Sequence, residues 1–538
     1  MPKLELFFQQ NRAVSPTPPR AAKPSSPPYH CTHSIRSIVA LTFVLIFILL
    51  LFSCGDTYAQ DRRITIHPNE ISSIRHTIIE RLPDGEPTCC EHEWNVRYLH
   101  YHPASVVPRR MYHSACNTDT NTPSMFTSVS LGENRRHPEP DPSSGAIIRS
   151  EYDPATGRLI PKEMRRFKEC IWSEGIATSS DCSTIAMLCR RNFDDKDFDF
   201  DSLATHKDKD WMTQPKCAHH SMWLYEWNNG DIMSTPRKYV VHRSMDFDWE
   251  YGNNYLRYAE DQNVYGIGMK ARVFGGGGCH EADAFLVLNR TDYHFTDRGY
   301  AWACGTGHTI FNRPVYNEET GKFALMCGTD GSNAGSNLAG YWFRREDLQS
   351  KEFFRTNFSN IHFKGGPGAL LPMEDGGYLG ILVGVNGRVR PQNEVPQTPP
   401  TSIGLVRFDS QGDMVGAIKW VAEKDNTYLS HPQLAKLGTN RFLLGYGEMK
   451  RLRDAKDTSD ESYRIPWNHY LLEIDANGNR LTDPIELEGA GWGEQDEMVS
   501  LGNGRVGWAY IPDPTLKSAN EYASCNSKQL QLSVYGAR

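Results

Sequence analysis

The residues with the greatest capacity for chemistry are histidines and acidic residues that stand just before or within strand-like apolar segments. They are His280 with Glu281, His308, His362, His431, and Asp496 at the end of the run Glu494-Gln495-Asp496. Imidazole nitrogens and carboxylates are common ligands of divalent metals, and the same groups hydrogen-bond polar ligands such as anionic sugars. If the fold gathers these positions, the sequence predicts a metal site or a ligand-binding site there.

A denser acidic cluster lies in the segment NFDDKDFDFDS at 192–202. Asp197, Asp199 and Asp201 alternate within it, so in an extended segment their carboxylates point to the same side. Neighbouring carboxylates repel one another unless a cation or water relieves them, which makes a calcium site one interpretation. A solvated loop between two strands is the other interpretation, and we favour it.

The segment LLEIDANGNRL at 471–481 imitates a calcium loop. From Asp475 it reads D-x-N-x-N, and Glu486 stands at the twelfth position. A loop of the EF-hand type needs glycine at its sixth position and a helix on each side. Arg480 stands at the sixth position instead, and strand-like residues flank the segment. We therefore predict a turn between two strands.

Sequence motifs of other enzyme classes are missing. The chain has no H-E-x-x-H, G-x-S-x-G or S-x-x-K motif. The glycine-rich segment FGGGGCH at 274–280 lacks the Gly-Lys-Ser/Thr ending of a phosphate-binding loop, so we interpret it as a flexible loop.

The N-terminus has a composition unlike the rest of the chain. Residues 1–37 are Pro/Ser-rich and basic, which predicts disorder. The uncharged apolar run at 38–52 predicts a signal peptide within 38–59, cleaved before Gln60. A retained membrane anchor and a lipoprotein acylated at Cys54 are the alternatives. Each of the three exports the remainder, so we expect a secreted or cell-surface protein.

Export determines how the cysteines and the glycosylation sequons are interpreted. The chain has 13 cysteines, but their spacings match no zinc finger or ribbon, so we predict structural disulfides. If the host glycosylates, the sequons at Asn289 and Asn357 are acceptor sites.

The charge of the exported part excludes one class of partner. Beyond residue 59 there are 53 basic and 63 acidic residues, a net charge of −10. This balance argues against nucleic acid, and against a membrane surface other than through an uncleaved N-terminal segment. A protein or a glycan is the expected partner.

Two hairpin-like units recur along the chain. LLEIDANGNRL at 471–481 shares its plan with LVRFDSQGDMV at 405–415, and the segments at 147–159 and 223–232 repeat it with other turns. Each reads as a strand, a tight turn with glycine, and a returning strand. Two hairpins per unit, repeated without a convincing helix, are the pattern of a β-propeller.

One copy of the second unit carries a resemblance. The segment TSSDCSTIAML at 178–188 resembles the S-P-D-G-x-x-I-A strand-turn-strand of TolB-type (PD40-like) propeller repeats, with Cys182 where those repeats have glycine. Other copies match only in outline. The resemblance implies the fold and neither a specific family nor an activity.

We therefore predict an all-β protein, a seven-bladed β-propeller at 126–538, preceded by an irregular Cys/His-rich segment at 60–125. Six blades with an N-terminal cap at 60–165 are the alternative. The segment KQLQLSVYG at 528–536 has no strand after it, so an N-terminal strand is expected to close the ring. The predicted blades span 126–165, 171–245, 254–296, 308–345, 361–421, 431–487 and 495–535.

In a propeller the segments before the inner strands surround the mouth of the central channel. We place the candidate histidines and acids there and favour a protein- or glycan-binding scaffold module. The alternative is a metal-dependent carbohydrate-active enzyme, a lyase or a hydrolase, because such a fold hosts either function. In it, His280, His308 and His431 would be ligands, and Glu281 or Asp496 the acid or base. The sequence establishes no cofactor, and a divalent metal, calcium or a transition metal, is the candidate.

Overall fold

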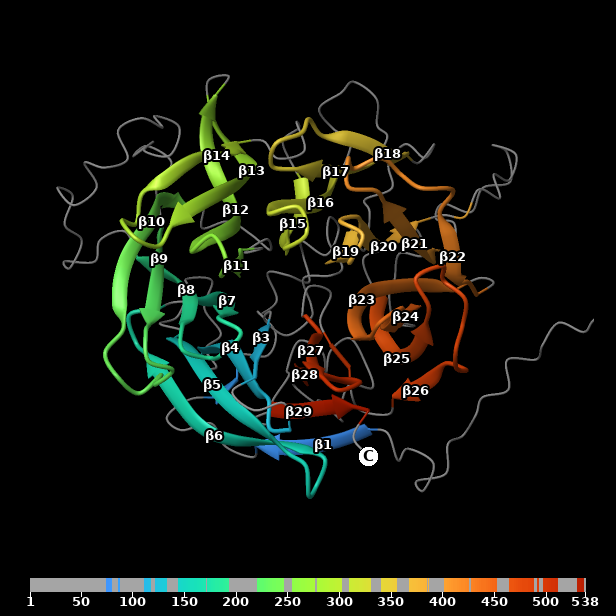
Figure 1. The fold of residues 1–538 in the computed structure, drawn as a ribbon, viewed down its shortest axis with the longest axis horizontal. Coiled ribbons are helices and arrows are strands. Elements are labelled where there is room, and N and C mark those ends of the chain that lie inside the picture. The colour runs from blue at the N-terminus through green and yellow to red at the C-terminus, as the bar shows by residue number, and fades with distance from the viewer. Residues whose placement is uncertain are drawn as a thin grey trace, which may run out of the picture. The chain divides into compact units, whose positions relative to one another are not determined.

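A computed structural model of the chain describes strands and tight turns within the unit formed by residues 64–538 (Figure 1). Nothing in the described part is a helix, so none of its segments is a helix able to cross a membrane. The apolar run at 38–52 lies outside it. The described residues are 74–79, 86–87, 111–117, 121–132, 144–170, 172–192, 220–245, 254–275, 278–301, 309–329, 340–355, 367–384, 386, 401–424, 427–451, 464–487, 491–492, 497–510 and 530–536.

The strands form seven antiparallel sheets, which are the blades of a β-propeller. Blade 1 contains β3 (Tyr112–Cys116), β4 (Ser124–Gly132), β5 (Ser144–Asp153) and β6 (Arg158–Phe167), with the short β2 (Glu86–Pro87) beside β4. Blade 2 contains β7 (Trp172–Thr178), β8 (Ile185–Asn192), β9 (His220–Trp227) and β10 (Arg237–Met245). Blade 3 contains β11 (Tyr255–Ala259), β12 (Val264–Gly275), β13 (Gly278–Asn289) and β14 (Phe295–Ala301). Blade 4 contains β15 (Thr309–Asn317), β16 (Lys322–Thr329), β17 (Gly340–Arg345) and β18 (Lys351–Arg355).

The remaining blades complete the ring. Blade 5 contains β19 (Pro367–Pro372), β20 (Tyr378–Gly384), β21 (Ser402–Phe408) and β22 (Lys419–Ala422). Blade 6 contains β23 (Tyr428–Gly438), β24 (Arg441–Arg451), β25 (Arg464–Ile474) and β26 (Ile485–Leu487). Blade 7 contains β27 (Val499–Gly502), β28 (Arg505–Tyr510), β29 (Leu530–Tyr535) and β1 (Ile74–Ile79). The prediction of seven blades is confirmed.

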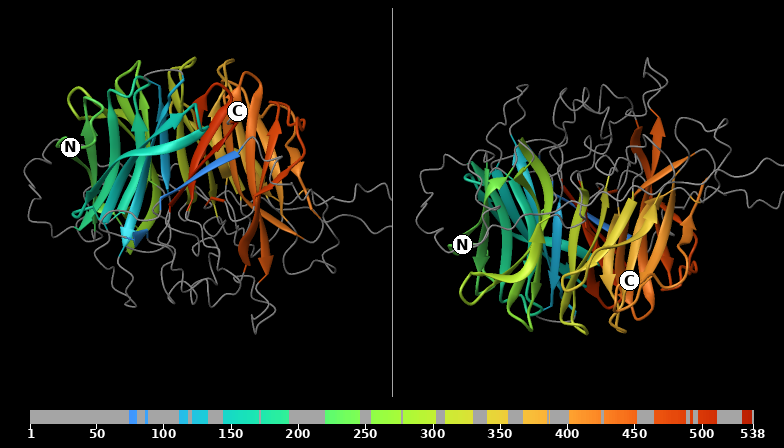
Figure 2. Two further views of the ribbon diagram at one scale, coloured as in Figure 1. Left: turned by 90° about the horizontal axis from the view of Figure 1, so that it is seen from below. Right: turned by 90° about the horizontal axis from the view of Figure 1, so that it is seen from above.

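The first strand of each blade is the inner strand, and the later strands lie progressively further from the axis (Figure 1). The strands of every blade run between the two ends of the ring, as the side views show (Figure 2). Because neighbouring strands are antiparallel, the turns from first to second strand and from third to fourth strand lie at one end, the hairpin end. The inner strands begin at the opposite end.

The N-terminal strand closes the ring, as expected from the unpaired segment at 528–536. Residues Ile74 to Ile79 of β1 pair antiparallel with Tyr535 to Leu530 of β29, so blade 7 draws its outermost strand from the start of the chain. The propeller therefore includes strands before residue 126. β1 and the inner strand β3 both fall in the segment 60–125, which we had expected to be irregular. The strand Tyr112–Cys116 is too short to show a clear alternation.

Packing between blades explains why many strands are apolar on both faces. Every residue of β20, sequence YLGILVG, is buried, because each blade of the ring packs against a neighbouring blade on either side. Large aromatic side chains fill the spaces, and Trp227, Trp492 and Trp508 are among the largest fully buried side chains. This supports a filling role for those tryptophans over a role in sugar stacking.

The repeated hairpin turns share one local design. In the turn of 471–481, Oδ1 of Asp475 accepts hydrogen bonds from the backbone N–H groups of Asn477 and Asn479 at 2.9 and 2.8 Å, and Gly478 has φ of 74°. In 405–415, Oδ1 of Asp409 accepts equivalent bonds and Gly412 has φ of 73°. The aspartate carboxylate is thus used by the turn itself, and the prediction of a turn between strands is confirmed.

Two disulfides join blades 1 and 2. Cys116 is bonded to Cys182, and Cys170 to Cys189. Cys182 has φ of 63°, in the left-handed region that glycine favours, at the position where TolB-type repeats have glycine. The turn geometry of those repeats is therefore kept here, and the cysteine adds a covalent link between blades.

Candidate functional site

The structure reaches only part of the site predicted from the sequence. His431 is described in full, and of His280 and Glu281 the strand position is known. Asn289 ends β13, and its Oδ1 accepts a hydrogen bond from the N–H of Thr291 at 2.8 Å. Outside the described residues lie His308, His362, Asp496, Asp197, Asp199, Asp201 and Asn357.

His280 and Glu281 do not precede an inner strand, contrary to our expectation. They belong to β13, the third strand of blade 3, where they pair with Val273 and Arg272 of β12. The reason is that the strands of this hairpin extend to Gly275 and Gly278, so most of the FGGGGCH segment is paired strand and not a loop.

His431 occupies an irregular point of the inner strand β23. The pairing of β23 with β24 shifts register between Ser430 and Gln433, and His431 has φ of 54°, which is strained for a residue other than glycine. Its Nδ1 is hydrogen-bonded to Oγ of Ser430, and its backbone carbonyl accepts a bond from Nε1 of Trp492 at 2.8 Å. Its Nε2 is buried and has no partner in the described part of the chain.

A second histidine lies beside His431. The ring centroids of His431 and His469 are 6.4 Å apart, and Nε2 of His469 donates to the carbonyl of Trp492 at 3.1 Å. Burial, reinforced by His469, lowers the pKa of His431 to about 3, and burial lowers the pKa of His469 to about 4. Both imidazoles are therefore neutral at physiological pH.

A group of polar side chains lies around Glu497, the residue that follows the predicted acid Asp496. Its carboxylate is 3% exposed and pairs with Nη2 and Nη1 of Arg257, the latter at 3.4 Å. Nε of Arg313 lies 3.6 Å from Oε1 of Glu497. Burial alone would raise the pKa of Glu497, but Arg257 and Arg313 outweigh burial and hold the pKa below its usual value.

Residues of other inner strands complete this group. Nη1 of Arg313 donates to Oε1 of Gln433 at 3.1 Å, and its guanidinium lies 5.1 Å from the ring centroid of Tyr255. Nε2 of His113 accepts the N–H of Ala509 at 3.2 Å, which places its proton on Nδ1, 3.1 Å from Oγ1 of Thr127. We call His113, Arg257, Arg313, Gln433 and Glu497 the channel cluster.

The channel cluster spans the ring. Its members come from β3, β11, β15, β23 and the segment just before β27, the inner strands of blades 1, 3, 4, 6 and 7. Contacts between blades 3 and 7, or 4 and 6, join blades that are not neighbours, so the side chains meet across the axis. Arg257, Arg313 and Gln433 lie at the middle of their strands. His113 and Glu497 lie nearer the end where the inner strands begin.

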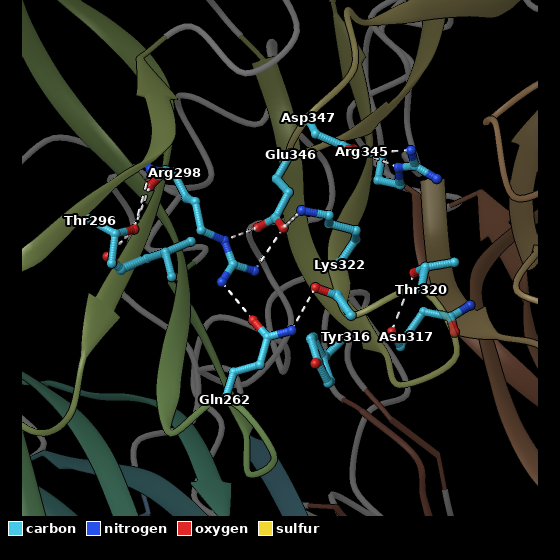
Figure 3. Close-up of polar contacts among 12 residues, drawn as sticks. Gln262, Thr296, Arg298, Tyr316, Asn317, Thr320, Lys322, Arg345, Glu346 and Asp347 are labelled. Carbon is cyan, nitrogen blue, oxygen red and sulfur yellow. Dashed lines mark hydrogen bonds and ion pairs between the residues drawn. The ribbon is translucent and has the colours of Figure 1, made fainter.

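A different ionic group lies between blades 3 and 4 (Figure 3). Nε and Nη2 of Arg298 donate to both oxygens of Glu346 at 3.0 and 2.7 Å, and Nζ of Lys322 is 3.6 Å from Oε1. Gln262 accepts from Arg298 at 2.6 Å and donates to the carbonyl of Gly321 at 2.8 Å. We call Gln262, Arg298, Lys322 and Glu346 the rim clamp, and its contacts join neighbouring blades only.

The chemistry of the channel cluster is that of a fixed charge pattern. The carboxylate of Glu497 is held ionised by two guanidiniums, which suits a counter-charge better than a proton donor. In the described part of the chain, no group of three or more His, Cys, Asp or Glu side chains is placed to hold a metal ion. The cluster therefore offers hydrogen-bond donors and positive charge at the axis.

Our sequence interpretation missed every member of the channel cluster. The available signal was a charged or amide residue inside an apolar inner strand, such as Arg257 in YLRYA or Gln433 in SHPQLA. A buried charge within a strand needs a partner, so such residues point to a polar group at the axis.

Comparisons with known proteins give remote likenesses to solved structures. No protein-family model and no curated protein sequence matches the chain. A Dyadobacter fermentans protein of unknown function has a TM-score of 0.40 at 9% identity, over 86% of this chain and 99% of that one. The β-propeller domain of the trilobed protease from Pyrococcus furiosus has a TM-score of 0.31 at 8% identity, over 74% and 98%. The GH93 α-L-arabinofuranosidase of Fusarium graminearum, solved with arabinobiose, has a TM-score of 0.36 at 8% identity, over 68% and 92%. None of these likenesses assigns an activity to this chain.

Proposed function

We propose that the protein is an exported β-propeller that binds a glycan over the channel cluster. The observation that carries this proposal is the meeting of Arg257 and Arg313, from two inner strands, at Glu497, with Gln433 of a third inner strand bonded to Arg313. A propeller brings many loops to the ends of one axis, so a polar group there is placed to contact a ligand from several sides.

The exposure of Arg257 supports ligand contact at this point. Its side chain is 26% exposed, whereas the side chain of its partner Glu497 is 3% exposed. A guanidinium that is anchored by a buried carboxylate and still reaches solvent has little freedom left to lose on binding. Such a group is prepared for polar recognition of a sugar.

The disulfides support export. The protein has the disulfides Cys116–Cys182 and Cys170–Cys189. Disulfides form in oxidising compartments and are rare in cytosolic proteins. A cleaved signal peptide within 38–59 agrees with this location, and extracellular glycans are the ligands accessible there.

A glycan array probed with the labelled full chain tests the proposal. We expect selective binding to a subset of glycans, followed by loss of binding in Arg257→Met. The matched control is Arg298→Met, which removes the same side chain from the rim clamp and should leave binding intact. Equal binding by wild type and Arg257→Met, or no glycan bound by a folded wild type, would contradict the proposal.

A metal-dependent carbohydrate-active enzyme is the second candidate, and one observation favours it. Nε2 of His431 is neutral, buried and without a described partner, which is the state in which imidazole ligates a metal. Metal analysis of freshly purified full chain is the test. This candidate requires a stoichiometric metal that is lost in His431→Ala, and a folded, metal-free wild type would exclude it.

A further inference from the structure

The channel cluster has an unbalanced charge among its described members. Arg257 and Arg313 are cations, and Glu497 is the single anion. His113 adds no charge at neutral pH, because burial lowers its pKa to about 4. Of the two cations, Arg257 is the one that reaches solvent, at 26% exposure, so it is the one that a ligand anion can approach.

The guanidinium of Arg257 has N–H donors that the described residues do not use. A guanidinium has five N–H groups. Those of Arg257 make three contacts, one with the carbonyl of Leu256 at 2.9 Å and two with the oxygens of Glu497. Two N–H groups therefore have no acceptor within the described part of the chain. They belong to a side chain that is 26% exposed, so they remain accessible to a ligand.

Building on the proposed glycan-binding function, we propose that the ligand is an acidic glycan whose uronate carboxylate pairs with the open edge of Arg257. Two N–H groups on a planar guanidinium match the two oxygens of a carboxylate. The pairing with Glu497 already uses one edge of the guanidinium in this way. A neutral sugar offers this edge no charged acceptor, so its pairing with Arg257 would be weaker.

The first measurement compares acidic ligands with neutral ones of the same backbone. Oligosaccharides of galacturonate, glucuronate and mannuronate are titrated calorimetrically into the full chain, each beside its methyl ester. We expect at least one acid to bind about 10- to 100-fold more tightly than its ester, because a charge-assisted pair is lost on esterification. The difference should shrink as salt is raised, because salt screens the accessible charge.

Two variants of the cluster should shift this affinity in opposite directions. Arg257→Met should weaken binding of the acid about 10- to 100-fold and leave the ester unaffected. Glu497→Gln removes the anion that competes for the guanidiniums, so it should bind the acid more tightly than wild type does. Arg298→Met is the matched control in the rim clamp and should match wild type.

Stability measurements keep the proposal testable if a variant folds poorly. Glu497→Gln should lower the melting temperature, and the acid, but not its ester, should restore it in a concentration-dependent way. Arg257→Lys retains the charge without the planar edge, and it should bind the acid more weakly than wild type does.

The outcomes separate this inference from the proposed function. If acid and ester bind equally and Arg257→Met weakens both to the same extent, the acidic ligand is wrong while glycan binding at the channel cluster stands. If inorganic sulfate stabilises Glu497→Gln as well as the oligosaccharides do at equal concentration, the site is one for small oxyanions and the uronate is wrong. If wild type binds no glycan on the array, the proposed function itself fails.

Discussion

The channel cluster and the rim clamp use the same chemistry in two places. Each has a nearly buried carboxylate, Glu497 at 3% exposure and Glu346 at 1%, and each carboxylate faces two cations. The two differ in what they connect and in the exposure of their cations. The rim clamp joins neighbouring blades through cations that are 28% and 35% exposed, whereas the channel cluster joins distant blades and includes Arg313 at 7%.

This difference bears on the proposal that the rim clamp is a structural tie and the channel cluster a ligand site. A partly exposed cation that loses its partner is rehydrated, so the rim clamp can be broken at modest cost. A buried cation cannot be rehydrated in place, so the channel cluster is expensive to break and calls for a counter-ion. The following predictions test that contrast, from the largest effect to the smallest.

Acidification should weaken the fold most strongly, through three buried histidines. His113, His431 and His469 have pKa values lowered to about 4, 3 and 4, so below pH 6.5 the unfolded chain binds protons that the folded chain excludes. Stability is therefore present above pH 6.5 and is lost as pH falls toward 4, by about 1.4 kcal/mol per pH unit for each imidazole. Urea unfolding at pH 7, 6 and 5 measures this slope.

The variant His113→Asn measures how much of this pH dependence of the free energy of unfolding comes from the channel cluster. Its pH dependence between 6.5 and 5 should be lower by about 1.4 kcal/mol per pH unit, because one titrating group is removed. An unchanged slope would show that His113 is not held neutral by the fold.

Glu497→Ala should lower the free energy of unfolding by about 3–5 kcal/mol, because it leaves Arg313 buried without its carboxylate. Chemical denaturation of the full chain gives this value. A loss smaller than that of Glu346→Ala would mean that the channel cluster is the better hydrated of the two.

Replacing Cys116 and Cys182 together by serine should lower the free energy of unfolding by about 2–4 kcal/mol, because the link between blades 1 and 2 is lost. The variant Cys116→Ser with Cys182→Gly should recover about 1 kcal/mol of that loss, since glycine adopts the φ of residue 182 without strain. Equal stability of the two double variants would argue against strain at this position.

Glu346→Ala should cost about 1–3 kcal/mol, less than Glu497→Ala, because Arg298 and Lys322 regain water. Glycan binding should be unchanged, since the rim clamp is at a blade junction and not at the axis. The same two measurements, denaturation and calorimetric titration, therefore distinguish the two ionic groups.

Asp475→Ala should have the smallest effect, below about 1 kcal/mol, because the lost hydrogen bonds lie in an exposed turn. Calcium should change the melting temperature of neither wild type nor the variant. A calcium-dependent rise that Asp475→Ala abolishes would restore the calcium interpretation of 471–481.

Much of the fold could be predicted because its signals are local. The turn of 471–481 combines an aspartate that accepts backbone N–H groups with a glycine at positive φ, and the same combination recurs at 405–415. Such a turn reverses the chain whatever lies around it, so repeated turns revealed repeated hairpins. The inner strand β3 was missed because Tyr112–Cys116 is too short to show a clear alternation.

The candidate site could not be predicted in the same way. Histidines were treated as the markers of chemistry, but His280 lies on the third strand of its blade, and His431 is enclosed between Ser430 and Trp492. The residues that meet at the axis are separated by up to several hundred positions, as Arg257 and Glu497 are. A sequence pattern over a few residues cannot predict that two such distant side chains will contact each other.

The sequence by itself determined the all-β class, the seven repeats and the closing strand, because strand alternation and turn chemistry act over a few residues. Only the tertiary structure decided which polar side chains converge. Closing seven blades into a ring brings side chains of distant inner strands into contact, and this depends on the register of every blade. Glu497, which the sequence interpretation did not single out, follows Asp496 and lies at the centre of the channel cluster because of this closure.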